Sequence, residues 1–477
     1  MGIQILKSRF RRGDFLAFGR RLQAETELLD KWFKARRFDR RSRAIGLELE
    51  TCLVDQRFEP APKNETLLRK IQNPQVVPEL SKFNVEINAA PQELGRDCLK
   101  KMHRNLKRTW KEVQKACAAM KLHMLMVGCL PTLEDEMLTL KYMSNNDRYR
   151  ALNAEVMSLR QGIPIRIHIQ GYDTLDVTHQ DVMLEAATTS MQIHLQVEAD
   201  KISRYFNAAM IASAPMVAVS ANSPFLFGKS LWEETRVPVF ERAVMTPGFA
   251  GKNGSLPPRV GFGSGFTRKS LYEVFRENLD FPVLLPLHFS KKKEEFCHVR
   301  LQNGTIWRWN RPVLGIDSQS KPHLRVEHRV CPAGPTIADM VANMAFFLGL
   351  VQVWATQKIP PESRISFGNV RDNFYAASHW GLSSTVQGFH PKERHLQTLL
   401  LRLLIPMAKK GLKALKIDRD DIHLYLDEIL IPRVKTARTG SAWQRGFIHR
   451  HGPDFRALAK EYFIFQEKDL PVHEWKL

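Results

Sequence analysis

The segment that most constrains this chain covers residues 45–55 and reads IGLELETCLVD. Apolar and acidic residues alternate in it with a period of two, which predicts a β-strand with one polar face. Glu48 and Glu50 lie side by side on that face. Two neighbouring carboxylates repel each other, and a bound divalent cation is a common physical reason to keep them together. A solvent-exposed edge strand with two hydrated acids is the alternative.

The segment 83–93 predicts a second strand of the same kind. Its apolar residues alternate with Glu86 and Asn88, so these two share a polar face. We expect this strand to end at Pro91, because proline donates no hydrogen bond to a sheet. Glu93 then follows a turn from which the chain can double back, which would bring a further carboxylate toward Glu86.

The segment 187–197 predicts a third strand, with Gln192, His194 and Gln196 on its polar face. A single histidine on a strand is more often structural than a metal ligand. Two amides on the same face, and carboxylates on the other strands, favour the functional interpretation here.

The segment 324–330 predicts a fourth strand, with Arg325, Glu327 and Arg329 on one face. An acid between two arginines fits a salt-bridge ladder, which is the structural alternative. In the functional interpretation, Glu327 is a metal ligand and the flanking cations neutralise a phosphoryl group in transfer.

Two further features between these strands could contact substrate. Arg236 is a candidate clamp for a substrate carboxylate, and its alternative is a surface ion pair with Glu233 or Glu234. The glycine-rich segment 261–265, followed by Lys269, lacks the spacing of a Walker loop or a dinucleotide fingerprint. We interpret it as a flexible loop.

The four predicted strands together present one acidic constellation, which consists of Glu48, Glu50, Glu86, Glu93, His194 and Glu327. Five carboxylates and one imidazole need cations if they share a cleft, and oxygen-rich sites select Mg²⁺ or Mn²⁺ over zinc. Such metals usually present nucleotide phosphates. The pattern therefore indicates phosphoryl transfer from ATP.

The composition indicates a globular protein with a basic surface. Of 477 residues, 44% are hydrophobic, and 71 Lys and Arg outnumber 50 Asp and Glu for a net charge of +21. This charge fits a polyanionic partner, a membrane surface or phosphate-bearing substrates. The basic residues are spread in short runs without a nucleic-acid-binding signature, so we expect no nucleic-acid partner.

The cysteines and the apolar segments favour a cytoplasmic protein. Six cysteines form no Cys-x-x-Cys pair, which indicates neither a disulfide framework nor a zinc site, and the N-terminus has no export signal. The apolar stretches 206–227 and 340–355 approach membrane length. The first contains prolines and polar residues and the second is short, so we expect both to form buried helices and expect no membrane association.

The order of these motifs resembles that of the glutamate–cysteine ligase family of the plant and proteobacterial type and its carboxylate–amine ligase relatives. The resemblance starts with GLELE at 46–50 and EINAAPQE at 86–93. It continues through QIH at 192–194, ANSPFLFG at 221–228 with Arg236, RVEHR at 325–329 and GSAWQR at 440–445. Each motif is weak alone, but the ordered set is specific.

The resemblance implies an α+β fold like that of glutamine synthetase, a curved antiparallel sheet that forms a funnel with surrounding helices. It implies ATP, Mg²⁺ or Mn²⁺, and small-molecule amino-acid and amine substrates. Glu50, Glu86 and Glu93 would hold one metal, and Glu48, His194 and Glu327 a second. Arg329 would act with Glu327 at the transferring phosphoryl group, Arg236, Asn88 and Gln192 would bind substrate, and Arg325 and Gln196 would bind ATP.

The implied reaction forms an amide through an acyl phosphate, with the glutamate γ-carboxylate and cysteine, or another amine, as default substrates. Ala376 and His379 stand where the family often has arginines, and Trp443 stands where a smaller or polar residue is usual. These departures concern substrate identity. A phosphotransferase on the same fold and a non-catalytic basic binding protein are the alternatives.

We expect three parts: an N-terminal helical segment at 1–43, a catalytic body at 44–385 and a mainly helical part at 386–477 packed on the same body. The prediction allows a homo-oligomer.

Overall fold

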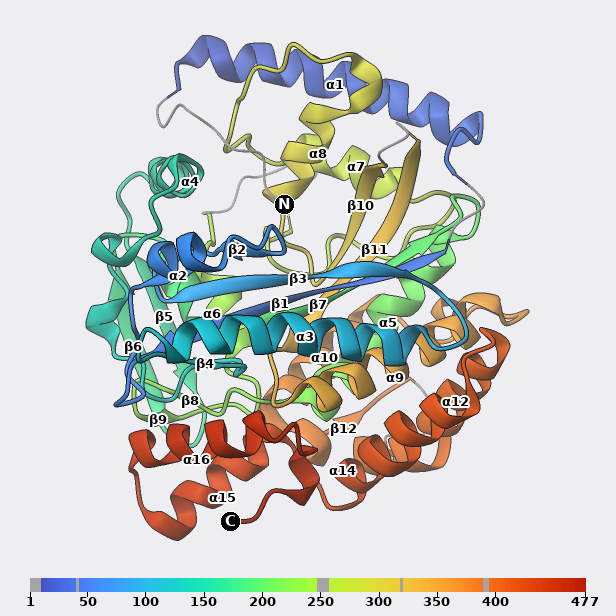
Figure 1. The fold of residues 1–477 in the computed structure, drawn as a ribbon. Coiled ribbons are helices and arrows are strands. Elements are labelled where there is room, and N and C mark those ends of the chain that lie inside the picture. The colour runs from blue at the N-terminus through green and yellow to red at the C-terminus, as the bar shows by residue number, and fades with distance from the viewer. Residues whose placement is uncertain (1–9, 40–42, 247–256, 318–320, 389–393) are drawn as a thin grey trace.

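The computed structural model describes residues 10–39, 43–246, 257–317, 321–388 and 394–477 (Figure 1). The expected absence of an export signal concerns residues 1–9, which lie outside the described residues. Part of the segment rich in glycine, proline and serine, 247–256, also lies outside them.

A seven-stranded antiparallel sheet organises the molecule. Its strand order is β10-β11-β7-β1-β3-β2, and β4 also pairs with β1. The strands are β1 (Ala44–Val54), β2 (Val76–Pro78), β3 (Asn84–Glu93), β4 (His123–Leu125), β7 (Ser190–Val197), β10 (Asn310–Ile316) and β11 (Pro322–Pro332). The four strands expected from sequence are thus four adjacent strands of one sheet, and the curled antiparallel sheet with many helices confirms the predicted fold class.

The apolar face of the sheet packs on a layer of helices. Helix α5 (Ile202–Ser220) packs on β11, α9 (Ile337–Thr356) packs on α5, α12 (Ile405–Ala414) packs on the far side of α9, and α3 (Cys98–Ala118) lies against β3. Gly349 of α9 and Gly411 of α12 meet where the two helices cross, and a Cβ on either would collide with the backbone of the other helix. Close approach of the helix backbones therefore depends on glycine at these two positions.

The remaining helices surround this core. They are α1 (Arg12–Lys34), α2 (Asn64–Ile71), α4 (Asp147–Leu159), α6 (Arg236–Ala243), α7 (Tyr272–Glu277), α8 (Cys297–Gly304), α10 (Phe367–Trp380), α11 (Leu396–Leu399), α13 (Arg419–Ile422), α14 (Ile431–Lys435), α15 (Gly440–His451) and α16 (Phe455–Glu467). In Figure 1, α1, α7 and α8 lie above the sheet, and α15 and α16 lie below it. The C-terminal part is helical as expected, and the division into three parts stays a prediction.

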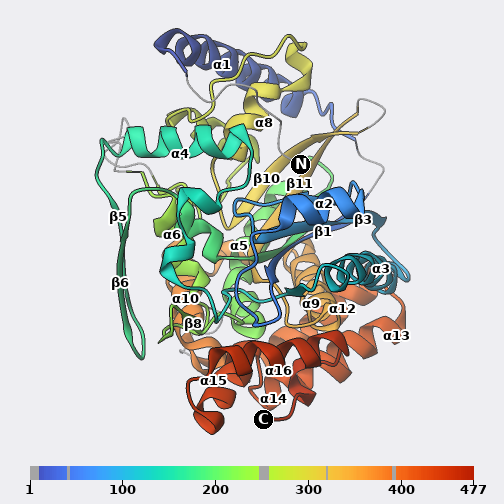
Figure 2. The same cartoon turned by 60° about the vertical axis from the view of Figure 1, so that its left-hand side comes forward.

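Three two-stranded ribbons lie outside the main sheet in the described parts of the chain. They pair β5 (Ile165–Gln170) with β6 (Thr174–His179), β8 (Phe225–Leu226) with β9 (Lys229–Ser230), and β12 (Thr385–Val386) with β13 (Arg394–His395). The β5–β6 ribbon lies at the left edge of the molecule in Figure 2.

The apolar helices are part of the core, as the sequence predicts. Among the described residues, α9 alone is long and apolar enough to cross a membrane, but 94% of its most apolar window is buried inside the protein. All six cysteines are buried and free.

The second strand of the predicted set is longer than expected. β3 does not end at Pro91 but continues to Glu93, where it pairs with Ala44. The register between β1 and β3 shifts near this point, because three steps on β3 (Ala89 to Gln92) match two on β1. Proline is tolerated in a strand at such an irregularity, since no regular ladder hydrogen bond is lost there.

Candidate active site

The strand register brings the predicted polar residues to one face of the sheet. Residues directly opposite each other in neighbouring strands share a face. The opposed pairs are Glu50 with Glu86, Glu48 with Asn88 and with Gln192, His194 with Glu327, and Gln196 with Arg325. On the opposite face, His328 stacks on Phe347 of α9 with ring centroids 4.3 Å apart. The polar face is therefore the one turned away from the helical core.

Glu48, His194 and Glu327 form the first of two groups, which we call the His194 cluster. One potential ligand atom from each residue lies within 4.8 Å of the others. His194 Nε2 is 3.1 Å from Glu48 Oε1 and 3.8 Å from Glu327 Oε1. Three strands, β1, β7 and β11, contribute one residue each.

Arginines neutralise the His194 cluster. Arg311 of β10 donates to both oxygens of Glu327 at 2.5 and 2.9 Å, and Arg329 donates to Oε1 at 3.2 Å. Burial by itself would raise the pKa of Glu327, but the two guanidinium groups hold it far below its usual range. Burial likewise opposes ionisation of Glu48, but the His194 imidazole lowers the pKa of Glu48 to about 2. Both carboxylates are therefore ionised at neutral pH.

The ring of His194 fits a metal ligand. Its side chain is buried, and among the described residues neither Nδ1 nor Nε2 finds a well-aligned hydrogen-bond partner, although Nε2 approaches Glu48. A buried polar nitrogen without a partner costs free energy, and metal coordination is one way to satisfy it. One imidazole and two carboxylates form a donor set suited to Mg²⁺ or Mn²⁺.

Glu50, Glu79 and Glu86 form the second group, which we call the Glu79 cluster. One oxygen of each again lies within 4.8 Å of the others. Asn88 donates to Glu86 at 2.6 Å, and the Ser190 amide and Gln192 donate to Glu50 at 2.6 and 2.8 Å. The donors to this cluster are therefore neutral.

Burial and mutual repulsion make the Glu79 cluster reluctant to ionise. Burial and then the charges of Glu48 and Glu50 raise the pKa of Glu86 to about 7. The pKa of Glu79 is raised well above its ordinary value by burial and by Glu86 and Glu50. Burial also raises the pKa of Glu50, although Arg329 and Ser190 oppose the shift. Three carboxylates held this close fit a divalent cation, which would replace the missing positive charge.

Gln192 and Arg329 join the two clusters. Gln192 donates to Glu50 and accepts a hydrogen bond from Arg329, which also contacts Glu327. The register between β7 and β11 shifts between His328 and Cys331, where β11 has one extra residue. Such a bulge redirects the side chain next to it. Arg329 thus contacts Glu327 of the His194 cluster directly and is connected to Glu50 of the Glu79 cluster through Gln192.

Glu93 does not join the Glu79 cluster, contrary to the sequence prediction. Its side chain is exposed and it pairs with Ala44, whereas Glu86 pairs with Glu50. At about 3.3 Å per residue, the extended strand separates Glu93 from Glu86 by roughly 20 Å. The prediction assumes a turn at Pro91, but the strand continues past this residue through an irregular pairing with β1.

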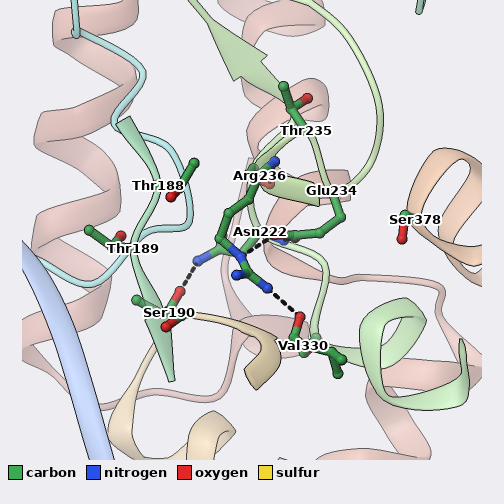
Figure 3. Close-up of polar contacts among 12 residues, drawn as sticks. Thr188, Thr189, Ser190, Asn222, Glu234, Thr235, Arg236, Val330 and Ser378 are labelled. Carbon is green, nitrogen blue, oxygen red and sulfur yellow. Dashed lines mark hydrogen bonds and ion pairs between the residues drawn. The ribbon is translucent and has the colours of Figure 1, made fainter. Parts of the chain in front are cut away.

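Arg236 is part of the protein's own packing (Figure 3). It is 2% exposed, donates through Nε to the buried Glu234 at 3.1 Å, and donates through Nη2 to the Val330 carbonyl. Its guanidinium also lies over the Trp309 ring. These contacts favour the ion-pair alternative, although the pair is buried and not at the surface, and the substrate clamp stays a prediction. A buried arginine bound to a carboxylate and a carbonyl links α6 to β11.

The predicted ATP-binding pair lies at the outer end of the polar face. Arg325 and Gln196 are opposed residues of β11 and β7, and both are half-buried. Burial lowers the pKa of Arg325, and the charges of Glu48 and Glu327 counteract this. Arg325 Nε has no hydrogen-bond partner.

Sequence reasoning missed Glu79, Arg311 and Glu185. Glu79 follows the short strand β2, and an acid directly after Val76-Val77-Pro78 was the available signal. Arg311 lies on β10, where Pro312 and Gly315 interrupt the alternation of apolar and polar residues that would identify a strand. Glu185 precedes β7, and burial together with the charge of Glu50 raises its pKa to about 8. No periodic pattern marks Glu185.

Two of the departures from the family pattern lie in aromatic contacts. His379 stacks on Trp232 and on Trp380, with ring centroids 4.8 and 4.1 Å apart. Trp443 is buried among Tyr462, Phe465 and Trp475 in the C-terminal helical part. Trp443 therefore contributes to the packing of that part and does not reach the acidic clusters.

The fold and the comparisons define the class of this protein, which is an ATP-dependent carboxylate–amine ligase. A family model described as glutamate-cysteine ligase family 2 (GCS2) matches residues 44–400. The chain belongs to this family, as the motifs predict. Family membership implies ATP and a divalent metal, and it favours the ligase over the non-catalytic alternative.

Solved structures of low sequence identity share the fold. The glutamate–cysteine ligase of Francisella tularensis, solved in complex with AMP, is 12% identical with a TM-score of 0.55, over 92% of this chain and 96% of that chain. A bifunctional glutathione synthetase from Pasteurella multocida is 10% identical with a TM-score of 0.52, over 94% of this chain and 54% of that chain. No curated protein matches this chain in a sequence comparison.

Proposed function

We propose that this protein joins the γ-carboxylate of glutamate to an amine, with cysteine as the default amine, through an acyl phosphate. In the first step a carboxylate oxygen attacks the γ-phosphorus of ATP, and the bond to the β-phosphate oxygen breaks to release ADP. In the second step the amine nitrogen attacks the acyl carbon, the carbon–oxygen bond to phosphate breaks, and the nitrogen loses a proton. Phosphate leaves far more readily than hydroxide would.

The observation that carries this proposal is the pair of acidic clusters on one sheet face, linked by Arg329. Alternate residues of β1, Glu48 and Glu50, belong to different clusters. Two cation sites side by side can hold the oxygens of one polyphosphate between them. This arrangement suits transfer of a phosphoryl group better than a single metal would.

In this proposal, the His194 cluster and the Glu79 cluster each hold one Mg²⁺ or Mn²⁺. The metals, when bound, polarise the phosphate oxygens and offset their negative charge. Arg329 donates to the phosphoryl group in transfer, and Glu327 holds Arg329 in place at 3.2 Å. Preorganised donors of this kind are most effective where charge develops.

The remaining predicted site residues have supporting roles. Gln192 orients Arg329 and Glu50, and Asn88 orients Glu86, so each acts next to substrate through a fixed hydrogen bond. Arg325 and Gln196 border the His194 cluster on the side where we place the nucleotide. The half-buried guanidinium of Arg325 suits a phosphate or ribose oxygen.

A phosphate-release assay tests the proposal. The purified protein is incubated with Mg²⁺-ATP, glutamate and a panel of amines that includes cysteine, and both phosphate and amide product are measured. We expect phosphate release that depends on the amine and equals the amide formed. A stable phosphorylated product without amide would instead establish the phosphotransferase alternative. The proposal fails if a well-folded sample releases no amine-dependent phosphate.

A further inference from the structure

A line of exposed cations along α3 has no role in the proposed ligase reaction. Lys100, Arg104, Arg108, Lys111 and Lys115 are all exposed, and we call them the α3 basic stripe. Their spacings of four, four, three and four residues keep them on one side of the helix. The buried residues of α3, such as Met102, Leu106 and Val113, occupy the opposite side.

The stripe is poorly neutralised by the protein itself. Asp97, before the helix, lies 2.9 Å from Lys101 and 3.9 Å from Arg104. Across the described parts of the chain, Lys100, Arg108, Lys111 and Lys115 have no ion pair. Like charges three and four residues apart destabilise a helix, so a row of them is maintained at a cost to stability.

Exposed basic residues of neighbouring elements also lie at both ends of α3, beside the exposed acids Asp418 and Glu112. At the N-terminal end of α3, Arg96 pairs its backbone with Lys416 after α12, and both side chains are exposed. At the other end, Asn73 contacts Glu112 of α3 at 3.0 Å, which places α2 with its exposed Arg69 and Lys70 alongside. Figure 1 shows α3 across the front of the molecule, with α2 above one end and α12 beyond the other.

The shape and chemistry of this surface favour a linear phosphate polyanion over a membrane. From Lys100 to Lys115 the stripe is about 22 Å long, with a cation about every 6 Å. Among the described residues, no large exposed apolar side chain lies on α2 or α3. Helices that bind membrane surfaces insert an apolar face, but the apolar face of α3 is buried in the protein core.

We propose that the α3 basic stripe, with its flanking residues, is a binding surface for a nucleic-acid backbone that is separate from the ligase site. The contacts are to phosphates, so binding is independent of base sequence and weakens steeply with salt. The five residues of the stripe lie in one helix, but only the fold adds the flanking residues of α2 and of the segment after α12, and the proposal replaces the sequence expectation of no nucleic-acid partner. The proposal does not depend on the ligase substrates.

Fluorescence anisotropy with labelled oligonucleotides tests this inference. The probes are single-stranded RNA and duplex DNA of about 20 units at about 50 mM salt, where phosphate contacts dominate affinity. The test variant is Arg108→Gln/Lys111→Gln/Lys115→Gln. The matched control, Lys291→Gln/Lys292→Gln/Lys293→Gln, removes the same charge from an exposed segment beside α1. The two probes show which nucleic acid the surface prefers.

We expect the α3 variant to bind at least about tenfold more weakly, with a slope of log affinity against log salt that is shallower by about two units. The control should change affinity less than about threefold, because only distant charge is lost. Thermal melting and ATP turnover of both variants should match those of the parent protein.

Three results would overturn the proposal. One is no binding by the parent protein at low salt. Another is an equal loss in the control, which would show that net charge alone attracts the probe. The third is tighter binding to vesicles rich in phosphatidylserine than to either oligonucleotide, with the same dependence on the α3 residues, which would assign the stripe to an anionic membrane.

Discussion

The two acidic clusters share strand β1, which contributes Glu48 to one and Glu50 to the other. The protein nevertheless neutralises the charge of the two clusters differently. In the His194 cluster, Arg311 and Arg329 hold Glu327, and the imidazole of His194 lies beside Glu48. In the Glu79 cluster, amide groups are the donors, and across the described residues none of its three carboxylates forms an ion pair. The first cluster is therefore charged and ordered by the protein, whereas the second depends on a bound cation or on protons.

The largest expected effect is on catalysis at the Glu79 cluster. Glu86→Gln removes a proposed metal ligand but keeps the side-chain volume, and we expect ATP turnover to fall at least about 1,000-fold, or ~4.1 kcal/mol. Glu93→Gln, on the same strand but exposed, is the matched control and should retain turnover within about twofold. Steady-state phosphate release measures both. If both variants lost turnover equally, removal of any charge from β3 would explain the loss, and a metal-ligand role of Glu86 would not be supported.

The next effect is on the stability of the metal-free protein. Glu327→Gln leaves Arg311 and Arg329 buried without their carboxylate, and we expect the free energy of unfolding to fall by about 3 kcal/mol. Asp176→Asn breaks the exposed ion pair with Arg166 and should cost less than about 1 kcal/mol. Urea denaturation in the presence of a chelator measures both. A loss for Glu327→Gln no larger than that control would contradict the view that its arginines neutralise the first cluster.

In the Glu79 cluster, removal of a carboxylate should stabilise the metal-free protein, whereas in the His194 cluster it should destabilise it. Glu79→Gln removes one of three mutually repelling carboxylates, so we expect the metal-free protein to gain about 1 kcal/mol. The same change removes a ligand, so the rise in melting temperature on adding Mg²⁺ should shrink. Thermal melts with and without Mg²⁺ measure the two effects. A variant that is less stable without metal, with an unchanged Mg²⁺ response, would remove Glu79 from the cation site.

A last expected difference between the two clusters is the pH dependence of stability without metal. The pKa of Glu86 is raised from an ordinary 4.5 to about 7, so the folded state binds more protons than the unfolded state between these values. Its stabilising contribution is present below pH 4.5 and is lost as pH rises to about 7. The pKa of Glu48 is lowered to about 2, so its contribution is present above pH 4.5 and is lost as pH falls toward 2.

Unfolding free energies measured across pH in the presence of a chelator check this difference. Glu86→Gln should flatten the decline between pH 4.5 and 7, and Glu48→Gln should flatten the rise between pH 2 and 4.5. If both variants flattened the same limb, the two clusters would not differ in charge state.

The strands that carry the site were predictable because their pattern is local. Period-two alternation in β1, β7 and β11 identifies both the strand and its polar face, since side chains of a strand point alternately to opposite sides. Glu48, Glu50, His194 and Glu327 were found in this way. The motif order then indicated the family, and the family match confirmed it.

Sequence reasoning was least informative where the position or the partners of a residue depend on neighbours that are distant in the chain. Pro91 ends most strands, but the shifted register beside β1 accommodates it, so Glu93 continues outward. Arg236 has the chemistry of a substrate clamp, but Glu234 and Val330 bind it inside the protein.

The sequence by itself determined which strands have polar faces, which residue types lie on them and to which family the chain belongs, because side-chain periodicity and motif order are properties of the chain. Only the tertiary structure decided that Glu79 and not Glu93 completes the second cluster, that Arg311 neutralises the first, and that α3, α2 and the end of α12 share one basic surface. Strand register and helix packing bring residues from distant segments within a few ångströms. Charge interactions at that range set which carboxylates are ionised and which need a cation.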